Sequence, residues 1–159
     1  MADSAPGGDD SKGKNAVAQP STVGTIMSRH VVTVTMDDTL AKARELFAKF
    51  RLHRLLVVQQ KLLVGIISDR DLLKAISPNV GTTSETERDH ATLNKRMHFL
   101  MSRNPVTVRP DTSIEAAARV LLEKGVSCLP VVGEQGDLLG IVTWRDMLKA
   151  ALPARASAA

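Results

Sequence analysis

The chain repeats itself, and this repeat constrains its fold more than any other feature of the sequence. The segment MSRHVVTV at 27–34 returns as MSRNPVTV at 101–108, an offset of 74 residues. Further along, GIISDRDLLKA at 65–75 returns as GIVTWRDMLKA at 140–150, an offset of 75 residues. Two blocks in the same order at nearly the same offset indicate a duplicated unit. We place the one extra residue of the second copy near Gly133–Asp137, where glycine and aspartate predict a turn.

Each copy predicts the same order of elements: a strand, a helix, a hairpin of two strands and a second helix. Short β-branched runs are typical of strands, and apolar residues three or four apart are typical of helices. The first copy has Val31–Val34, a helix from Leu40 to Phe50, Leu55–Val58, Val64–Ile67 and a helix from Ser68 to Ile76. The second copy has Val106–Val108, a helix from Ile114 to Leu122 ending at Gly125, Leu129–Val132, Leu138–Val142 and a helix from Thr143 to Ala151. Thr112 and Glu115 have the spacing of a capping box ahead of the Ile114 helix.

These patterns divide the chain into five parts. Residues 1–24 and 153–159 lack periodic apolar residues and are predicted as disordered tails. The first repeat spans residues 25–84 and the second spans residues 100–152. A linker helix is expected over residues 85–99, with its apolar positions turned inward at Leu93, Met97 and Leu100.

A unit of this size has one small sheet and two helices, and it cannot cover its apolar face alone. We therefore expect an α+β fold in which the two β-α-β-β-α repeats pack sheet against sheet around a pseudo-two-fold axis. Equivalent residues would then stand on both sides of a shared cleft. The chain would have up to two related pockets.

Composition and motifs argue against several classes of function. Aromatic residues make up only 3% of the chain and the net charge is +4, so both the stacking surfaces and the strong charge that favour nucleic-acid binding are missing. The single cysteine, Cys128, excludes an internal disulfide and a Cys-based zinc site. The histidines lack metal-ligand spacing, and no Walker loop or Ser-His-Asp order appears. We expect no enzyme and no metal.

The start of the chain, MADSAPGGDD, is acidic and Gly-rich, unlike a secretory signal. No apolar run approaches the roughly 20 residues that span a bilayer. We therefore expect a cytoplasmic protein without a membrane partner.

The doubled unit, with M-S-x-x-V/P-V-T-V opening each copy and G-I-I/V-S/T-x-R-D closing it, resembles a tandem pair of cystathionine-β-synthase (CBS) domains, a Bateman module. The resemblance covers about residues 25–151. It implies a stand-alone regulatory module that binds an adenine nucleotide, AMP, ADP or ATP, in the clefts between the copies. It further implies a homodimer, an unidentified effector protein and no required cofactor.

The nucleotide signature of that family stands in both copies, as Gly65–Asp71 and Gly140–Asp146. In each, a hydroxyl residue, Ser68 or Thr143, ends a strand where a helix begins. The free amides and positive dipole of a helix N-terminus attract phosphate, and the carboxylate three residues on can accept two ribose hydroxyls. The same spacing is also a plain capping box, so this alternative stays open.

Other candidates come from the resemblance. The segments that enter the first strand of each copy are expected beside the adenine, and the residues ahead of the second strand beside the pocket. The apolar-Pro step common in the family is kept at Leu129–Pro130 and lost at Leu55–Leu56. With the signature, the candidate ligand-binding residues are Ile26, Met27, Val32, Thr33, His53, Arg54, Leu55, Ser68, Arg70, Asp71, Met101, Val106, Thr107, Ser127, Leu129, Pro130, Thr143, Arg145 and Asp146.

Positive charge is concentrated in the first copy, because residues 25–74 carry a net charge of +4 and residues 100–149 are neutral. A basic cluster stands at the end of the first long helix, at Lys49, Arg51, His53 and Arg54. It either holds a polyphosphate by charge-assisted hydrogen bonds or is a solvated helix end. Trp144 is expected either at a dimer contact or over the mouth of a pocket.

The leading hypothesis is a sensor that binds adenine nucleotides and signals through a change in conformation or in dimer packing. The alternative is a structural dimerisation or adaptor module whose clefts stay empty. The loss of proline at Leu56 and the capping interpretation of the signature favour the alternative.

Overall fold

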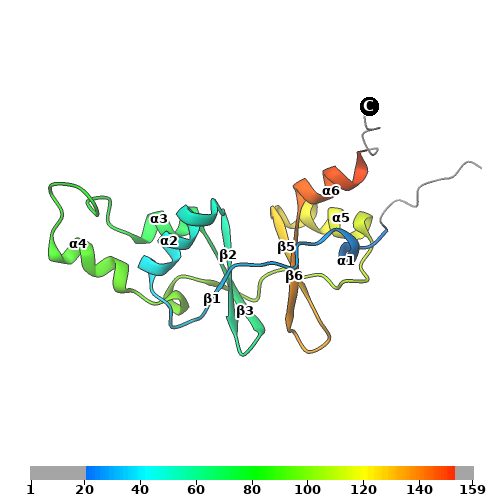
Figure 1. The fold of residues 1–159 in the computed structure, drawn as a ribbon, viewed down its shortest axis with the longest axis horizontal. Helices are drawn as coiled ribbons and strands as arrows, with labels where there is room; N and C mark the ends of the chain where they lie inside the picture. The colour runs from blue at the N-terminus through cyan, green and yellow to red at the C-terminus, as the bar shows by residue number, and fades with distance from the viewer. Residues whose placement is uncertain (1–20, 153–159) are drawn as a thin grey trace, which may run out of the picture.

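The computed structural model describes residues 21–152, which form two lobes of helices and strands side by side (Figure 1). The first lobe contains β1 (Thr33–Val34), α2 (Leu40–Phe50), β2 (Arg54–Gln59), β3 (Leu62–Ser68) and α3 (Asp69–Ala75). The second contains α5 (Ile114–Lys124), β5 (Cys128–Val132), β6 (Leu138–Thr143) and α6 (Trp144–Ala151). Shorter elements lead into them: α1 (Val23–Ile26), α4 (Glu87–Ala91), η1 (Thr92–Asn94), η2 (Met97–Phe99) and β4 (Ser102–Arg103).

The two sheets lie in the middle of the molecule, with the helices on the outside, as expected of two repeats packed sheet to sheet (Figure 1). The first sheet has the order β1-β2-β3-β4, with β1 parallel to β2 and the other pairs antiparallel, and the second is the antiparallel pair β5-β6. The two hairpin tips are joined, since the Leu63 amide donates to the Gly136 carbonyl at 3.1 Å and the Leu138 amide donates to the Lys61 carbonyl at 3.0 Å. The predicted α+β class is confirmed.

Strand pairings recur at the offset of the sequence repeat, so the two lobes share one backbone plan. Equivalent pairs are Val34–Val57 and Val108–Val131, Ile66–Ser102 and Ser28–Ile141, and Thr39–Arg96 and Thr22–Ser113. The offset changes only at the hairpin turn, because Val58 pairs with Leu63 whereas Val132 pairs with Leu138. The extra residue of the second copy therefore lies in the predicted turn.

Each core is completed by the segment that leads into the other repeat. Val23 and Met27 lie at the start of the first repeat, yet they are buried in the core of the second lobe beside Leu129. Met97 and Met101 lie at the start of the second repeat, and they are buried in the core of the first lobe. Separating the lobes would open both cores.

This exchange corrects the predicted end of the N-terminal tail. The tail was expected to run through residue 24, but Val23 begins α1 and is fully buried. The Val23 and Gly24 amides donate to carbonyls of the second repeat, those of Thr112 and Pro110, each at 2.8 Å. The rest of that predicted tail, residues 1–20, and the predicted tail 153–159 lie outside the described residues.

The predicted linker helix over residues 85–99 is wrong as a single helix. It breaks into α4, η1 and η2, because backbone groups along it bond to the first repeat instead of to one another. The Lys95 carbonyl accepts from the Leu40 amide, and the Met97 amide donates to the Asp38 carbonyl, both at 2.9 Å. Leu93 and Met97 are buried as expected.

Two local predictions in the second repeat also change. Only Val108 of the expected strand Val106–Val108 pairs with the sheet, through a single bridge. The cap of α5 is Ser113 and not Thr112, since the Ser113 hydroxyl accepts from the Ala116 amide at 3.1 Å. The Thr112 hydroxyl is already used by the turn before the helix, where it accepts from the Arg109 amide.

The glycine that opens each signature lies where an exchanged segment crosses the sheet. A Cβ on Gly140 would lie 2.7 Å from the Ser28 carbonyl oxygen and 2.9 Å from the Met27 sulfur. A Cβ on Gly65 would first meet the Met101 sulfur, at 2.7 Å. Glycine at these positions therefore permits the close approach of two backbones.

We expect Gly140→Ala to destabilise the protein more than Gly65→Ala, because a carbonyl oxygen cannot move aside as a thioether can. Overpacking of this kind costs about 1–3 kcal/mol, and we place Gly140→Ala at the upper end. Urea unfolding followed by circular dichroism measures both variants. Equal losses, or a larger loss for Gly65→Ala, would contradict the crossing geometry.

The carboxylate of Asp89 joins the linker to the segment after α3 through hydrogen bonds. The Ser77 hydroxyl donates to Asp89 Oδ1 at 2.5 Å, and the Thr86 amide donates to Asp89 Oδ2 at 2.9 Å. These hydrogen bonds, the one from Ser77 first, lower the pKa of Asp89 from 3.8 to about 2. Asp89 also completes a capping box with Thr86 at the start of α4.

Because the pKa of Asp89 is lower in the folded state, its contribution to stability is present above pH 3.8 and is lost as the pH falls through about 2. We expect Asp89→Asn to make the unfolding temperature less dependent on pH across this window, as followed by circular dichroism. Glu87→Gln, on the same helix, is the control and should keep the wild-type dependence. A wild-type slope in Asp89→Asn would show that the carboxylate does not hold the linker.

Candidate functional site

A cleft of about 320 Å³ opens between the lobes, where β2 and β5 begin and α6 starts. Its volume is within the range of about 300–1,000 Å³ typical of small-molecule sites. The residues that line it are Arg51, Leu52, His53 and Arg54 of the first lobe and Ser127, Cys128, Ile141, Thr143, Trp144 and Arg145 of the second. Both repeats contribute walls, so the cleft exists only because the lobes are paired.

The backbone around the cleft obeys the pseudo-symmetry, but the side chains do not. The Asp69 amide donates to the His53 carbonyl, and the equivalent Trp144 amide donates to the Ser127 carbonyl, both at 3.3 Å. In the first lobe the side chains at these positions form a hydrogen bond, with His53 Nδ1 2.8 Å from Asp69 Oδ2. In the second lobe the same positions hold a hydroxyl and an indole. The two halves of the cleft therefore offer different chemistry.

Both signatures form helix caps. The Asp146 amide donates to the Thr143 hydroxyl at 3.3 Å, and Asp146 Oδ2 accepts from the Thr143 amide at 2.9 Å and from its hydroxyl at 2.7 Å. At α3, the Asp71 amide donates to the Ser68 hydroxyl at 3.0 Å, and that hydroxyl donates to Asp71 Oδ2. Within residues 21–152, neither Oδ1 of Asp71 nor Oδ1 of Asp146 accepts a hydrogen bond. A cap and a contact with ribose are therefore compatible.

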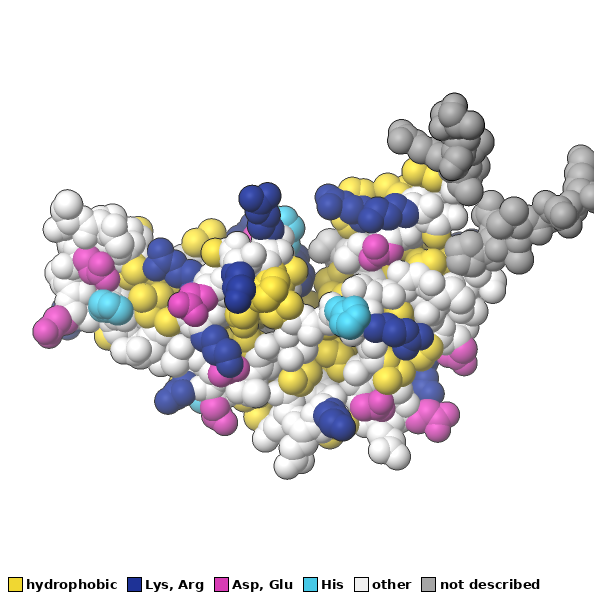
Figure 2. Space-filling model, viewed as in Figure 1, with side chains coloured by type: hydrophobic (Ala, Val, Ile, Leu, Met, Phe, Trp, Pro, Cys, Tyr) yellow, Lys and Arg dark blue, Asp and Glu magenta, His cyan; other side chains and the backbone are white. Residues whose placement is uncertain are grey.

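Cations dominate the electrostatics of the cleft. No ion pair within residues 21–152 uses Arg51, Arg54 or Arg145. The Arg54 guanidinium donates to the His53 carbonyl at 3.0 Å. The hydrogen bond from His53 holds the pKa of Asp69 below its usual value, against the opposing effect of burial. Figure 2 shows Lys and Arg side chains on both sides of the notch between the lobes. Such a surface suits an anion.

Trp144 and Cys128 complete the second-lobe wall. Trp144 lines the cleft and is half exposed, with the Arg145 guanidinium 5.7 Å from the centre of its ring. Its place in the lining agrees with the expected position at the mouth of the pocket. Burial raises the pKa of the Cys128 thiol, and the charge of Arg54 opposes this only in part. The thiol is therefore protonated at neutral pH and packs as an apolar group.

The structure brings some of the predicted site residues together and separates others. The predicted residues that line the cleft are His53, Arg54, Ser127, Thr143 and Arg145. Five others are buried in the cores behind its walls, namely Met27, Leu55, Met101, Leu129 and Pro130. Thr33 lines a separate hollow of about 490 Å³ between the lobes, near the hairpin tips.

The remaining predicted residues lie elsewhere. Asp146 lies one helical turn after Thr143 and is hydrogen-bonded to it, and it is not part of the cleft lining. Ser68, Arg70 and Asp71 lie at the start of α3 and are not part of the cleft lining. Ile26, Val32 and Val106 are half-buried against the cores, and Thr107 is exposed.

The structure divides the basic cluster between the cleft and the end of α2. Lys49 is not part of the cleft lining, and its ammonium lies 5.4 Å from the ring centre of Phe50 at the end of α2. Arg51, His53 and Arg54 line the cleft. The site list drawn from the sequence lacked Arg51, Leu52, Cys128, Ile141 and Trp144. The repeat offset could have identified Cys128, because this residue stands 74 residues after Arg54, which was predicted as a site residue.

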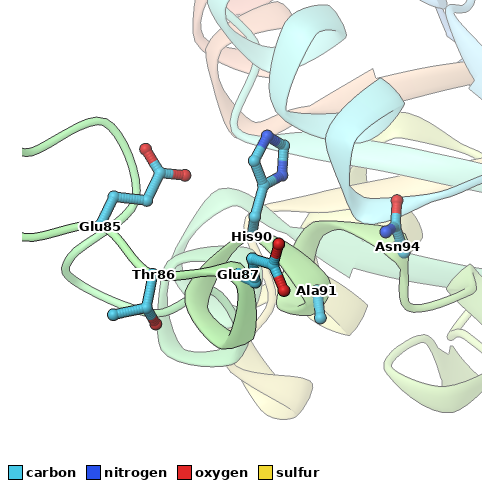
Figure 3. A pocket seen from close by; sticks show the side chains of 6 residues that line it. All are labelled: Glu85, Thr86, Glu87, His90, Ala91 and Asn94. Atoms are coloured by element: carbon cyan, nitrogen blue, oxygen red, sulfur yellow. The ribbon is translucent and has the colours of Figure 1, made fainter.

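A further hollow of about 490 Å³ lies along the linker, at the far side of the first lobe from the cleft (Figures 1 and 3). Figure 3 shows Glu85, Glu87 and His90 around it, all from α4 and the loop before it. Across residues 21–152, no three His, Cys, Asp or Glu side chains are grouped closely enough to hold a metal ion. No helix in this part of the chain is long and apolar enough to cross a bilayer.

Comparison with known proteins gives the family. The model of the CBS domain matches residues 23–78 and 97–153. A CBS domain-containing protein of Dictyostelium discoideum is 35% identical over 128 residues, which cover 79% of this chain and 88% of that protein. An inosine-5'-monophosphate dehydrogenase of Korarchaeum cryptofilum is 29% identical over 119 residues, which cover 75% of this chain and only 22% of the enzyme.

Solved structures agree. The crystal structure of CBSX2 of Arabidopsis thaliana in complex with AMP matches with a TM-score of 0.70 and 33% identity, over 83% of this chain and 96% of that chain. The cytosolic domain of the Mg²⁺ channel MgtE in complex with ATP matches with a TM-score of 0.67 and 27% identity, over 81% of this chain and 48% of that chain. With two matched domains and one shared cleft, this chain belongs to the CBS domain family as a tandem pair of CBS domains.

Proposed function

We propose that the chain is a regulatory module that binds an adenine nucleotide of the AMP, ADP or ATP class between its two CBS repeats. The observation that carries this proposal is the cleft, which has walls from both repeats and three arginines outside any described ion pair. Support comes from the relatives, because CBSX2 was solved with AMP and the MgtE domain with ATP.

The arrangement of polar groups suggests how a nucleotide binds. Oδ1 of Asp146 is free to accept from a ribose hydroxyl while Oδ2 keeps the cap of α6. The phosphates then face the start of α6 and the arginines around it, where charge-assisted hydrogen bonds are strongest. Asp71 and Ser68 offer the equivalent groups at α3 for a second nucleotide.

A ligand held by both lobes favours one relative orientation of the repeats. Since each core contains a segment of the other repeat, a shift between the lobes also moves α1 and the linker. Binding would thereby change the outer helices that a partner contacts, which is a population shift and requires no catalysis.

We expect Asp146→Asn to weaken binding of adenine nucleotides about tenfold, because an amide keeps one acceptor for the cap but loses the second for ribose. Trp144 is the only tryptophan and lines the cleft, so its fluorescence reports titrations with AMP, ADP and ATP. Calorimetry gives the number of sites. Asp71→Asn should remove the other site if both are filled.

Asp89→Asn is the matched control for this experiment. It changes an aspartate in the same kind of capping box, at α4, where no residue of the cleft lies. Its affinity should equal that of the wild type. If millimolar adenylates give no heat and no fluorescence change, the nucleotide proposal fails. If Asp146→Asn and Asp71→Asn bind normally, the ribose role is wrong and capping is the only function of these residues.

We also propose that the chain forms a homodimer through its outer helices. Large leucines stand exposed on α3, α5 and α6, with exposed fractions of 71% for Leu73, 82% for Leu122 and 55% for Leu148. Covering such side chains is favourable by about 25 cal/mol per Å².

The second candidate function, a dimerisation or adaptor module with empty clefts, is favoured by the same surface together with the capping role of both signatures.

Analytical ultracentrifugation tests the dimer. We expect Leu122→Asp combined with Leu148→Asp to weaken dimerisation at least tenfold, because charges would have to be buried at the interface. Phe99→Asp is the control, since Phe99 is equally exposed but lies on η2 in the linker. A monomeric wild type, or a dimer unaffected by the leucine changes, would contradict the proposed interface. A dimer that adenylates leave unchanged in every property would favour the adaptor function.

A further inference from the structure

Arg51 has a backbone conformation that its residue type disfavours. It follows α2 with φ 51° and ψ 45°, in the left-handed region. At the equivalent position after α5, the second repeat has Gly125, with φ 62°. Glycine adopts this region without a steric penalty, whereas a residue with a Cβ is strained there. A strained arginine where the other repeat keeps glycine points to a role for its side chain.

That side chain reaches a surface with two other free cations. Arg51 lines the cleft together with Arg54 of the same lobe and Arg145 of the other. Among the ion pairs of residues 21–152, none neutralises any of the three. Asp69 is hydrogen-bonded to His53, and the charge of Arg54 also helps to hold the pKa of Asp69 low. Three guanidinium groups outside any described ion pair, around one cleft, supply more positive charge than a single phosphate requires.

We infer that Arg51 is a specificity-determining residue that makes the cleft prefer nucleotides with two or three phosphates over nucleoside monophosphates. The inference rests on the proposed nucleotide-binding function and adds the class of ligand, which is nucleoside di- and triphosphates. In this arrangement Arg54, half-buried at the start of β2, and Arg145, at the start of α6, hold the phosphate nearest the ribose. Arg51, exposed at the end of α2, contacts the outer phosphates, which a monophosphate lacks. The second repeat has no cation at this position, because Gly125 occupies it.

The test is Arg51→Gly, which restores the residue that the second repeat carries. Glycine suits the left-handed backbone, so we expect the variant to fold and its unfolding temperature to stay within a few degrees of the wild type. Its affinity for ATP should fall roughly five- to tenfold, and its affinity for AMP by less than twofold, because only ATP loses a charge-assisted contact. Lys49→Ala, which removes a nearby cation outside the cleft, should change neither affinity.

Two further measurements make the result specific. In the wild type, ATP binding should weaken with salt more steeply than AMP binding, and Arg51→Gly should remove the difference. Arg51→Lys, which keeps the charge but not the planar fork, should recover part of the preference for ATP. Inorganic tripolyphosphate, which has the phosphate chain without a nucleoside, should quench or shift the Trp144 fluorescence of the wild type and not that of Arg51→Gly.

The outcomes separate this inference from the proposed function. Equal affinities of the wild type for AMP and ATP, or equal losses of both in Arg51→Gly, would overturn the inference and leave the nucleotide site in place. Failure of every adenylate to bind would overturn the nucleotide proposal. If adenylates do not bind but tripolyphosphate binds in a way that depends on Arg51, a polyphosphate site is still supported. If tripolyphosphate does not bind either, the polyphosphate site is overturned as well.

Discussion

Each lobe of this molecule is closed by a segment that belongs, along the chain, to the other repeat. Val23 and Met27 fill the second core, and Met97 and Met101 fill the first. A repeat of this size buries too little apolar surface to be stable alone, so the exchange joins two marginal units into one structure. It also explains why the signatures open with glycine, because at Gly140 a backbone carbonyl of the crossing segment occupies the space of a Cβ.

The cleft is a consequence of this pairing. Once the crossing segments set the register of the sheets, the starts of β2, β5 and α6 meet at one place between the lobes. Duplication supplied a symmetric backbone, as the matching bonds of Asp69 to His53 and of Trp144 to Ser127 show. Substitution then made the side chains unequal. One wall has the hydrogen bond between His53 and Asp69 and the left-handed Arg51, and the other has an indole.

Much of the fold follows from short-range pattern. The α+β class, the hairpins and the helices α2, α3, α5 and α6 were all predicted from periodicity and the repeat, and their positions agree to within a few residues. The errors occur where long-range contacts decide. The linker is not one helix because the Leu40 amide takes the Lys95 carbonyl, and α1 is ordered because Val23 enters the far core. Neither contact leaves a local signal.

The candidate site divides in the same way. The sequence by itself determined that two S/T-x-x-D signatures stand at strand–helix junctions, since residue type and spacing are enough to define a cap. Only the tertiary structure decided which of them opens onto the cleft and which cations gather there. Leu55 and Leu129 lie in the cores, whereas Arg51 and Trp144 reach the cleft. The physical reason is that local spacing determines hydrogen bonds within a turn, whereas the crossing of distant segments determines which side chains share a surface.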